Sequence, residues 1–351
     1  MYTKFLILFL LISFYGCSNG QKEKRVTVVK ETAFLLLQAD STDQIGAPAL
    51  IQTVERGFII FDSATYKFIL FDPQGNKLLS FGKKGKGPGE FLSLSGFKEF
   101  EDFYLVFDYR TAKFLKYRLN GEFIEDVGLN SDYFPILPVS IEALEPDRFI
   151  MPSFGKNGSL LMDIDRIKNK VQYFGNSVGD YVENLRPGES IKAITSRKIP
   201  AYMLNTVELS SNRTGIFSFQ QTTALLEKYS YSRELIWKKK IETPALDRLF
   251  DIFFEKNIER INKGLPEKYP FIYARDLEAN DKGVAILLNL MEKDPVTLYW
   301  VSNDGKDDKV VTFEGMKKQP YQFSISEHEN KSYIFFTNFM EGTIYKAEWP
   351  L

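Results

Sequence analysis

The fold is decided by the stretch Phe58–Asp62, FIIFD, because Tyr104–Asp108, YLVFD, repeats it at an offset of 46 residues. At the same ungapped offset the sequence matches at five further pairs: Thr65/Thr111, Lys67/Lys113, Phe68/Phe114, Gly75/Gly121 and Gly82/Gly128. Each unit has an apolar strand, a short turn, a second strand, a Gln-Gly or Asn-Gly turn and a third strand. A period of about 40 to 50 residues with three or four short strands per unit is typical of a β-propeller blade.

Four weaker copies predict further blades, with strands at 148–151, 161–164, 171–175, 215–219, 226–230, 235–238, 283–288, 297–301, 310–313, 332–336 and 343–347. The last unit is expected to stop after three strands, so it is incomplete. Val26–Leu37 reads as a strand without a unit, and we expect it to pair with Thr343–Ala347, which would close the ring and remove both sheet edges. The sequence therefore predicts an all-β, six-bladed propeller over residues 26–351, with five or seven blades as alternatives.

Two regions depart from the period. Residues 176–200 are polar, contain Pro187, Gly188 and Pro200, and predict a long loop. Residues 245–262 place leucine, phenylalanine and isoleucine at helical spacing with charges on the other face, which predicts one inserted amphipathic helix. We expect this helix to pack against the ring; a lid over the central channel and a docking helix for a partner are the alternatives.

The N-terminus, MYTKFLILFLLISFYGCSNG, predicts a signal peptide over residues 1–16. Lys4 is its positive region, and the apolar run Phe5–Tyr15 is shorter than the about 20 residues of a membrane-spanning helix. The run ends at Gly16-Cys17, which resembles a bacterial lipobox, so we expect lipid on Cys17 and a flexible tether over 17–25. An ordinary secretory peptide is the alternative. Ser18 after the cysteine resembles the residue of lipoproteins forwarded to the outer membrane. Lys22–Arg25, KEKR, does not resemble the acidic surface-export tag of Bacteroidetes lipoproteins, which favours a periplasm-facing protein, with surface exposure as the alternative.

Composition excludes several classes of site. The 351 residues contain one Cys and one His, which allow no intramolecular disulfide and no zinc site of the usual Cys/His kind. Lys and Arg number 45 against 46 Asp and Glu, so the chain has no net positive field for nucleic acid. Aromatic residues make up 15% of the chain, and Phe and Tyr favour pleated, half-buried surfaces.

The segment Phe81–Phe91, FGKKGKGPGEF, carries a family resemblance. It resembles the glycine-rich blade connector of six-bladed, NHL-like and TolB-like propeller lipoproteins of the Bacteroidetes type. The resemblance implies the fold and the envelope location, but no activity, because a fold does not determine a function.

The same segment is a candidate binding loop. Converging backbone N–H groups and lysines would hold an anion such as phosphate or carboxylate, and the residues concerned are Lys83, Lys84, Gly85, Lys86, Gly87 and Gly89. The loop lacks the G-K-[ST] ending of a P-loop. The alternative is a blade connector in which glycine provides positive φ and Glu90 pairs locally.

Calcium is the one metal that the resemblance suggests, because six-bladed sugar-lactonase enzymes hold it with Glu, Asn and Asp near the channel. Candidates here, each expected just after an inner strand, are Asp62, Asp108, Asn289 and Asn338. The alternative role for such an aspartate is a structural acceptor that closes the next turn. His328 is the only candidate for a histidine base and has no recognisable partner motif. Tyr66, Tyr109 and Tyr133 are candidates for a binding face.

The sequence thus favours a non-catalytic role: a lipid-anchored binding or scaffold module of the cell envelope that recognises a peptide, a glycan or a partner protein on a propeller face. No cofactor is expected for it, and no nucleic acid. The alternatives are a calcium-dependent enzyme of the lactonase or lyase kind, and a subunit that docks onto a larger envelope complex through helix 245–262.

Overall fold

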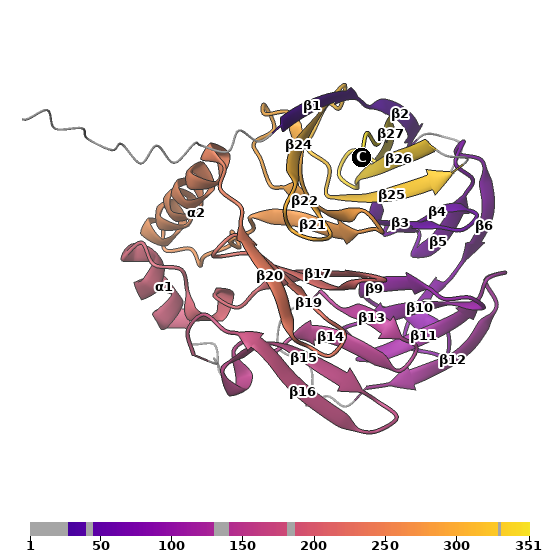
Figure 1. Cartoon of the computed structure of the whole chain (residues 1–351), viewed down its shortest axis with the longest axis horizontal. Coiled ribbons are helices and arrows are strands. Elements are labelled where there is room, and N and C mark those ends of the chain that lie inside the picture. Colours follow the sequence, from indigo (N-terminus) through magenta and orange to yellow (C-terminus); the bar gives the residue numbers. More distant parts are fainter. Residues whose placement is uncertain (1–26, 40–44, 130–139, 181–186, 329–330) are drawn as a thin grey trace, which may run out of the picture.

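A computed structural model of the chain describes residues 27–39, 45–129, 140–180, 187–328 and 331–351, and six sheets surround a common centre (Figure 1). Blades 1 and 2 consist of β3 (Pro48–Val54), β4 (Gly57–Asp62), β5 (Lys67–Phe71), β6 (Lys77–Phe81), and of β9 (Leu94–Glu99), β10 (Phe103–Asp108), β11 (Lys113–Arg118), β12 (Phe123–Gly128). Blades 3 and 4 consist of β13 (Glu142–Glu145), β14 (Arg148–Pro152), β15 (Ser159–Asp165), β16 (Lys170–Asn176), and of β17 (Val207–Asn212), β18 (Gly215–Gln220), β19 (Leu225–Tyr229), β20 (Leu235–Lys240).

Blades 5 and 6 recruit strands from both ends of the chain. Blade 5 consists of β21 (Ala274–Ala279), β22 (Gly283–Leu288), β23 (Val296–Ser302), β24 (Asp308–Glu314) and β1 (Thr27–Thr32). Blade 6 consists of β25 (Gln322–His328), β26 (Lys331–Asn338), β27 (Thr343–Glu348) and β2 (Phe34–Gln38). The six-bladed prediction is therefore confirmed.

The aromatic residues fill the spaces between blades. Every residue of β4 and of β22 is buried, because the second strand of a blade is covered by the neighbouring blades on both faces. Phe58 of blade 1 stacks on Phe335 of blade 6, with ring centroids 4.5 Å apart, and Phe81 stacks on Tyr104 of blade 2 at 5.6 Å. Such aromatic pairs stabilise the contact beyond the area they bury.

Ring closure follows the prediction in one part and departs from it in another. β2 pairs antiparallel with β27, so a strand from the N-terminal end completes blade 6. The prediction of a single strand over Val26–Leu37 is wrong, because β1 is a separate strand that pairs in parallel with β24 of blade 5. Ala33, between the two strands, is buried and donates its N–H to Glu314 O, at the point where the chain passes from blade 5 to blade 6.

All connectors between blades lie on one face of the ring. Each of blades 1 to 5 has four consecutive antiparallel strands, to which blade 5 adds the parallel β1, and β2 is the fourth antiparallel strand of blade 6. The chain therefore leaves the fourth strand and enters the next inner strand at the same end each time. We call this the connector face. It carries both helices, α1 (Pro187–Thr195) before blade 4 and α2 (Pro244–Asn262) before blade 5, which contact each other at one side of the ring (Figure 1).

The helix predicted at 245–262 is confirmed as α2, but the expectation of a single helix is wrong. α1 lies inside the region 176–200 that the sequence predicted to be a loop. Its proline stands at the first helical position, where its missing N–H costs nothing and its φ suits a helix, so Pro187 begins the helix rather than breaking one. Ile194 is fully buried under the polar surface of this short helix.

Candidate functional site

A central channel of about 390 Å³ runs between the inner strands of the six blades. Its lining is mostly polar and includes Gln52, Ser95, Lys98, Ser140, Glu142, Glu208, Ser210, Ser211, Arg275, Asp276, Glu278 and Gln322. The inner strand of a blade has no partner strand on its channel side, so the side chains around it decide how its backbone groups are satisfied.

Side chains of one inner strand accept hydrogen bonds from the backbone of the next. Asp276 Oδ2 accepts from Phe323 N at 2.9 Å, and Glu278 Oε1 accepts from Ile325 N at 3.0 Å, which links blade 5 to blade 6. The hydroxyls of three serines take the same role in other blade pairs: Ser140 with Leu209 N, Ser210 with Ala279 N and Ser324 with Thr53 N. Much of the polar channel lining therefore holds the blades in register.

The channel carboxyls are less charged than their number indicates. Burial raises the pKa of Glu208 to about 8, of Asp276 to about 7 and of Glu278 to about 8. Glu142 instead pairs with Lys98 at 2.6 Å; although burial lowers the pKa of Lys98, the attraction of Glu142 raises it overall. At neutral pH a large part of the negative charge of the channel is therefore protonated or paired.

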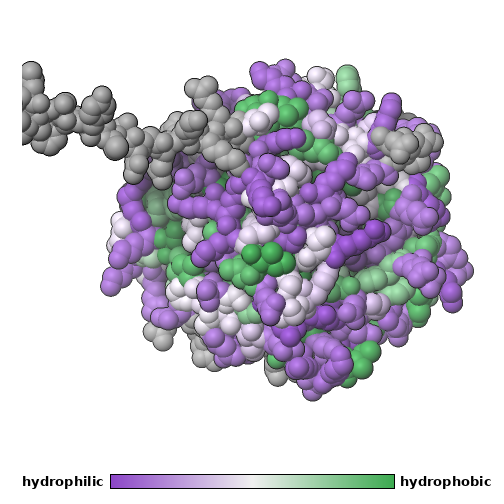
Figure 2. All heavy atoms as spheres, in the orientation of Figure 1, coloured by the Kyte–Doolittle hydropathy of each residue, from purple (hydrophilic) through white to green (hydrophobic). Residues whose placement is uncertain are grey.

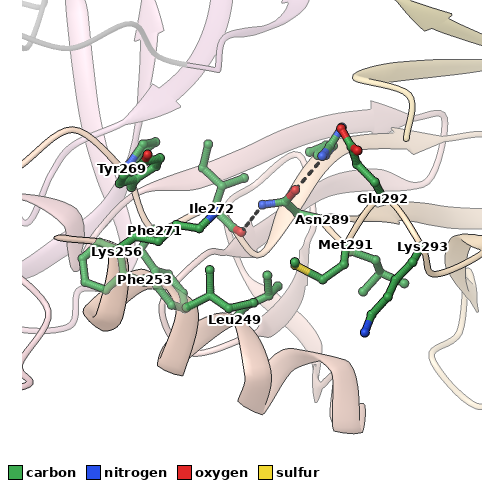
Figure 3. A pocket seen from close by; sticks show the side chains of 14 residues that line it. Leu249, Phe253, Lys256, Tyr269, Phe271, Ile272, Asn289, Met291, Glu292 and Lys293 are labelled. Atoms are coloured by element: carbon green, nitrogen blue, oxygen red, sulfur yellow. Dashed lines mark hydrogen bonds between the residues drawn. The ribbon is translucent and has the colours of Figure 1, made fainter. Parts of the chain in front are cut away.

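Two pockets flank the channel mouth on the connector face. We call them the α2 pocket, about 500 Å³, which shares Arg275 with the channel, and the blade-4 pocket, about 450 Å³, which shares Ser140 and Glu208 with it. Figure 3 shows the α2 pocket between α2 and the ring. Residues 267–272, which we call the divider, contribute to both: the blade-4 pocket is lined by all six, and the α2 pocket by the last four.

The divider is anchored to both helices. Asn257 of α2 is fully buried, donates Nδ2 to Tyr269 O at 3.0 Å, and accepts at Oδ1 from the N–H groups of Lys268 and Tyr269, both at 3.1 Å. On the other side, Ser190 of α1 donates a hydrogen bond to the carboxylate of Glu267. The pockets are thus preformed by specific contacts, which lowers the ordering cost of binding.

Phe271 fixes the middle of the divider. Its ring lies 4.5 Å from that of Phe250 and 5.5 Å from that of Phe253, and it is buried in the largest hydrophobic core cluster. Sequence reasoning missed this segment, although its Pro-bounded aromatic run, Pro266-Glu-Lys-Tyr-Pro-Phe-Ile-Tyr273, was the available signal. Prolines restrict φ, and aromatic side chains outside a strand often line a binding face.

The four calcium candidates lie on the connector face, each at the end of the second strand of its blade, and none of them lines the channel. Asp62 accepts from Gly46 N and Ala47 N, and Asp108 accepts from Leu92 N and Ser93 N, so each aspartate fastens the connector that enters its own blade. The two asparagines also donate hydrogen bonds to connectors, Asn289 Nδ2 to Ile272 O and Asn338 Nδ2 to Gln319 O. None of the four bonds to another, and within the described residues no three His, Cys, Asp or Glu side chains form a metal-binding group.

The glycine-rich segment is the connector between blades 1 and 2, and it contains the short parallel ribbon of β7 (Lys83–Lys84) and β8 (Glu90–Phe91). Its amides serve the protein's own acceptors: Gly85 N donates to Phe91 O, and Gly87 N donates to Glu90 Oε2. Glu90 also pairs with Lys83 at 2.7 Å. The lysines Lys84 and Lys86 are exposed, the former 4.3 Å above the Tyr66 ring. This arrangement favours the connector role, and anion binding by Lys83, Lys84, Gly85, Lys86, Gly87 and Gly89 stays a prediction.

Other predicted residues fall outside what the structure describes or away from the pockets. Cys17, with the signal peptide and the tether, and Tyr133 lie outside the described residues. The backbone of His328 ends β25, opposite Lys331. Tyr109 packs into the core of blades 2 and 3. Neither helix in the described part of the chain has the length and apolar composition that a membrane span needs.

Comparison with solved structures returns propellers of low sequence identity. A protein of Bacteroides fragilis described as a "Putative exported protein" is 13% identical, with a TM-score of 0.55 over 93% of this chain and 99% of that one. A member of the DUF4221 family from Bacteroides vulgatus is 9% identical, with a TM-score of 0.50 over 92% and 97% of the two chains. An inactive virginiamycin B lyase from Staphylococcus aureus is 10% identical, with a TM-score of 0.49 over 89% and 98%. Identities this low show the fold alone.

Comparison of sequences gives the family. No curated protein matches the chain. The model of the DUF5128 family, described as a 6-bladed beta-propeller, matches residues 17–269, which is more than half of the sequence and agrees with the six blades of the structure. The chain therefore belongs to the DUF5128 family of six-bladed β-propellers.

Proposed function

We propose that this propeller is a ligand-binding module of the bacterial cell envelope, whose ligand binds on the connector face at the channel mouth. The observation that carries the proposal is the pair of preformed pockets on either side of the divider. Apolar and aromatic side chains make up most of the lining of both, and their volumes fall in the range of about 300 to 1,000 Å³ that small-molecule sites occupy.

Binding is favoured over catalysis by what the polar groups already do. Asp276 and Glu278 in the channel accept hydrogen bonds from blade 6, and Asp62 and Asp108 hold connectors. A catalytic carboxylate must be free to exchange a proton with a substrate or to contact it. These four carboxyl groups are engaged in holding the ring together, whereas the pocket walls are free to receive a ligand.

Substitution of Ile272 tests the proposal. This residue lines both pockets and is 38% exposed, so Ile272→Glu places a charge in both without removing a core residue. The probe is the neutral apolar dye N-phenyl-1-naphthylamine, titrated by fluorescence. We expect saturable binding to the wild-type protein and a loss of affinity of about tenfold or more in the variant. An apolar dye would have to displace water from the new carboxylate without forming a hydrogen bond to it, which costs more than the 1.4 kcal/mol of a tenfold change.

Leu265→Glu is the matched control. Leu265 is 46% exposed, stands two residues before the divider, and contributes to neither pocket. We expect this variant to bind the dye like the wild type. Wild-type protein without a saturable site, or equal loss of binding in both variants, would contradict the proposed site.

The envelope location rests on Cys17, which we propose to be lipidated after removal of residues 1–16, with the propeller tethered to the outer membrane and facing the periplasm. The short apolar run that ends at Gly16-Cys17 supports this. We expect Cys17→Ala to move the protein from the membrane fraction of a Bacteroides host to another fraction and to abolish metabolic labelling with an alkyne fatty acid, because acyl chains on the cysteine provide the membrane affinity. Unchanged labelling and unchanged membrane association would refute lipidation at this residue.

A further inference from the structure

Arg275 stands where the α2 pocket meets the channel, at the second position of β21. Its Nε donates to Asn289 Oδ1 at 2.7 Å, and its Nη1 donates to Pro320 O at 2.7 Å. Its guanidinium also lies 4.9 Å from the centre of the Tyr321 ring. These contacts fix the orientation of the side chain, and all of them are to neutral groups.

The guanidinium has capacity left for an anion. It has five N–H donors, and among the described residues no acceptor bonds to the two on Nη2 and no carboxylate forms an ion pair with Arg275. Burial lowers its pKa, opposed by Tyr321 and Glu292, yet an arginine stays protonated at physiological pH. A positive charge is thus held partly away from water with the attraction of Glu292 but without a direct ion pair among the described residues, and an incoming anion would stabilise it further.

The remaining pocket walls are apolar and the charges around them are mainly positive. Figure 3 shows Leu249 and Phe253 of α2 on one side of the cavity, with Asn289 and Glu292 at the other end. The apolar lining consists of Leu249, Ile252, Phe253, Phe271, Ile272, Leu290 and Met291. Three cationic side chains line the pocket, Arg275, Lys256 and Lys293, against the single carboxylate of Glu292.

We propose that the α2 pocket binds an amphiphilic carboxylate of the medium-chain fatty acid class, with its carboxylate on Arg275 and its hydrocarbon chain along the apolar wall toward α2. This rests on the proposed function and adds the chemical class of its ligand. A peptide fits less well, because its backbone needs several polar partners, and the Asn289 amide has one of its two N–H groups bonded to Ile272 O and one lone pair of its Oδ1 bonded to Arg275 Nε. A fatty acid needs only one cation and an apolar wall.

Calorimetric titration of octanoate and of 1-octanol into the wild-type protein tests the inference. The two probes share their hydrocarbon chain and differ in charge. We expect octanoate to bind about tenfold or more tightly at low ionic strength, because a charge-assisted hydrogen bond to a partly buried guanidinium exceeds the 1.4 kcal/mol that corresponds to tenfold. Equal affinities of the two probes would overturn the inference.

Variants assign the preference to one residue. Arg275→Gln keeps hydrogen-bond donors for its neutral neighbours and is expected to remove the preference for octanoate, whereas Arg275→Lys, which retains the charge, is expected to keep part of it. Arg213→Gln is the control, because Arg213 is exposed on the hairpin between β17 and β18 and lines neither pocket. A preference that persists in Arg275→Gln would refute the role of this arginine.

The outcome is separable from that of the proposed function. Dye binding that depends on Ile272, together with equal affinities for octanoate and 1-octanol, would refute the fatty-acid inference and leave the site standing. Absence of saturable dye binding would refute the proposed function itself. If Arg275→Gln fails to fold, the comparison of octanoate with 1-octanol on the wild-type protein still tests the fatty-acid inference.

Discussion

Deletion of residues 1–39 is expected to abolish the folded ring, whereas deletion of residues 1–26 is expected to leave its stability unchanged. The longer deletion removes β1, which pairs with β24, and β2, whose backbone pairs with β27 from Phe34 opposite Lys346 to Gln38 opposite Thr343. It also removes Leu36 and Leu37, which pack against the core between blades 6 and 1.

The expected loss of stability is large because the deletion removes the strand that closes the ring as well as its contacts. The ladder pairs four residues of β2 with β27. Its hydrogen bonds, at about 1 kcal/mol each, and two half-buried leucines together come to on the order of 5 kcal/mol or more. That is comparable with the about 5 to 15 kcal/mol by which a whole domain is stable. β27 would in addition become an open edge strand next to blade 1, which favours aggregation.

Urea denaturation followed by circular dichroism, with size-exclusion chromatography, measures both deletions. Since β1, at Thr27, is the first described strand, the shorter deletion serves as the matched control. A cooperative transition at the same urea concentration in both proteins would show that the ring does not depend on closure by β2.

Asp62→Ala is expected to destabilise the protein by on the order of 4 kcal/mol, because Asp62 is fully buried and its carboxylate accepts four hydrogen bonds. These come from Gly46 N at 2.9 Å, Ala47 N at 2.8 Å, Ala64 N at 3.0 Å and Thr65 Oγ1 at 3.1 Å. Without the carboxylate, the connector that enters blade 1 and the turn that follows β4 lose a shared acceptor.

Asp72→Ala is the control for this substitution. Asp72 also accepts backbone hydrogen bonds, from Gln74 N and Asn76 N, but in an exposed hairpin turn where water replaces a lost partner. We expect a much smaller loss of unfolding free energy. Similar losses in the two variants, measured by urea denaturation, would mean that Asp62 does not act as a connector clamp.

The sequence predicted the blades through their second and third strands. These strands are covered on both faces, so they are continuous apolar runs such as FIIFD, and the repeated Asp-x-x-Thr after them marks the same clamp in blades 1 and 2, where Thr65 and Thr111 both donate to the aspartate. The equivalence of Asp62 and Asp108 was therefore visible in the sequence, and so was the alternative that they close a turn.

The inner strands and the site could not be predicted in the same way. β21, Ala-Arg-Asp-Leu-Glu-Ala, faces a polar channel on one side, so its three charged residues look like those of a solvent-exposed strand. Arg275, Asp276 and Glu278 consequently carried no signal that distinguished them from surface charges. The pockets also need the divider to meet α2 through Asn257, a contact between segments that no local pattern encodes.

Hydrogen–deuterium exchange with saturating N-phenyl-1-naphthylamine tests the central claim, that the ligand site lies at the channel mouth on the connector face. We predict slower exchange in residues 249–256, 267–272 and 289–293, which contain the pocket-lining residues of α2, the divider and the segment after β22, and unchanged exchange in blades 1 and 2. Protection confined to other blades, to the Gly85–Gly89 connector or to the opposite face would contradict this account.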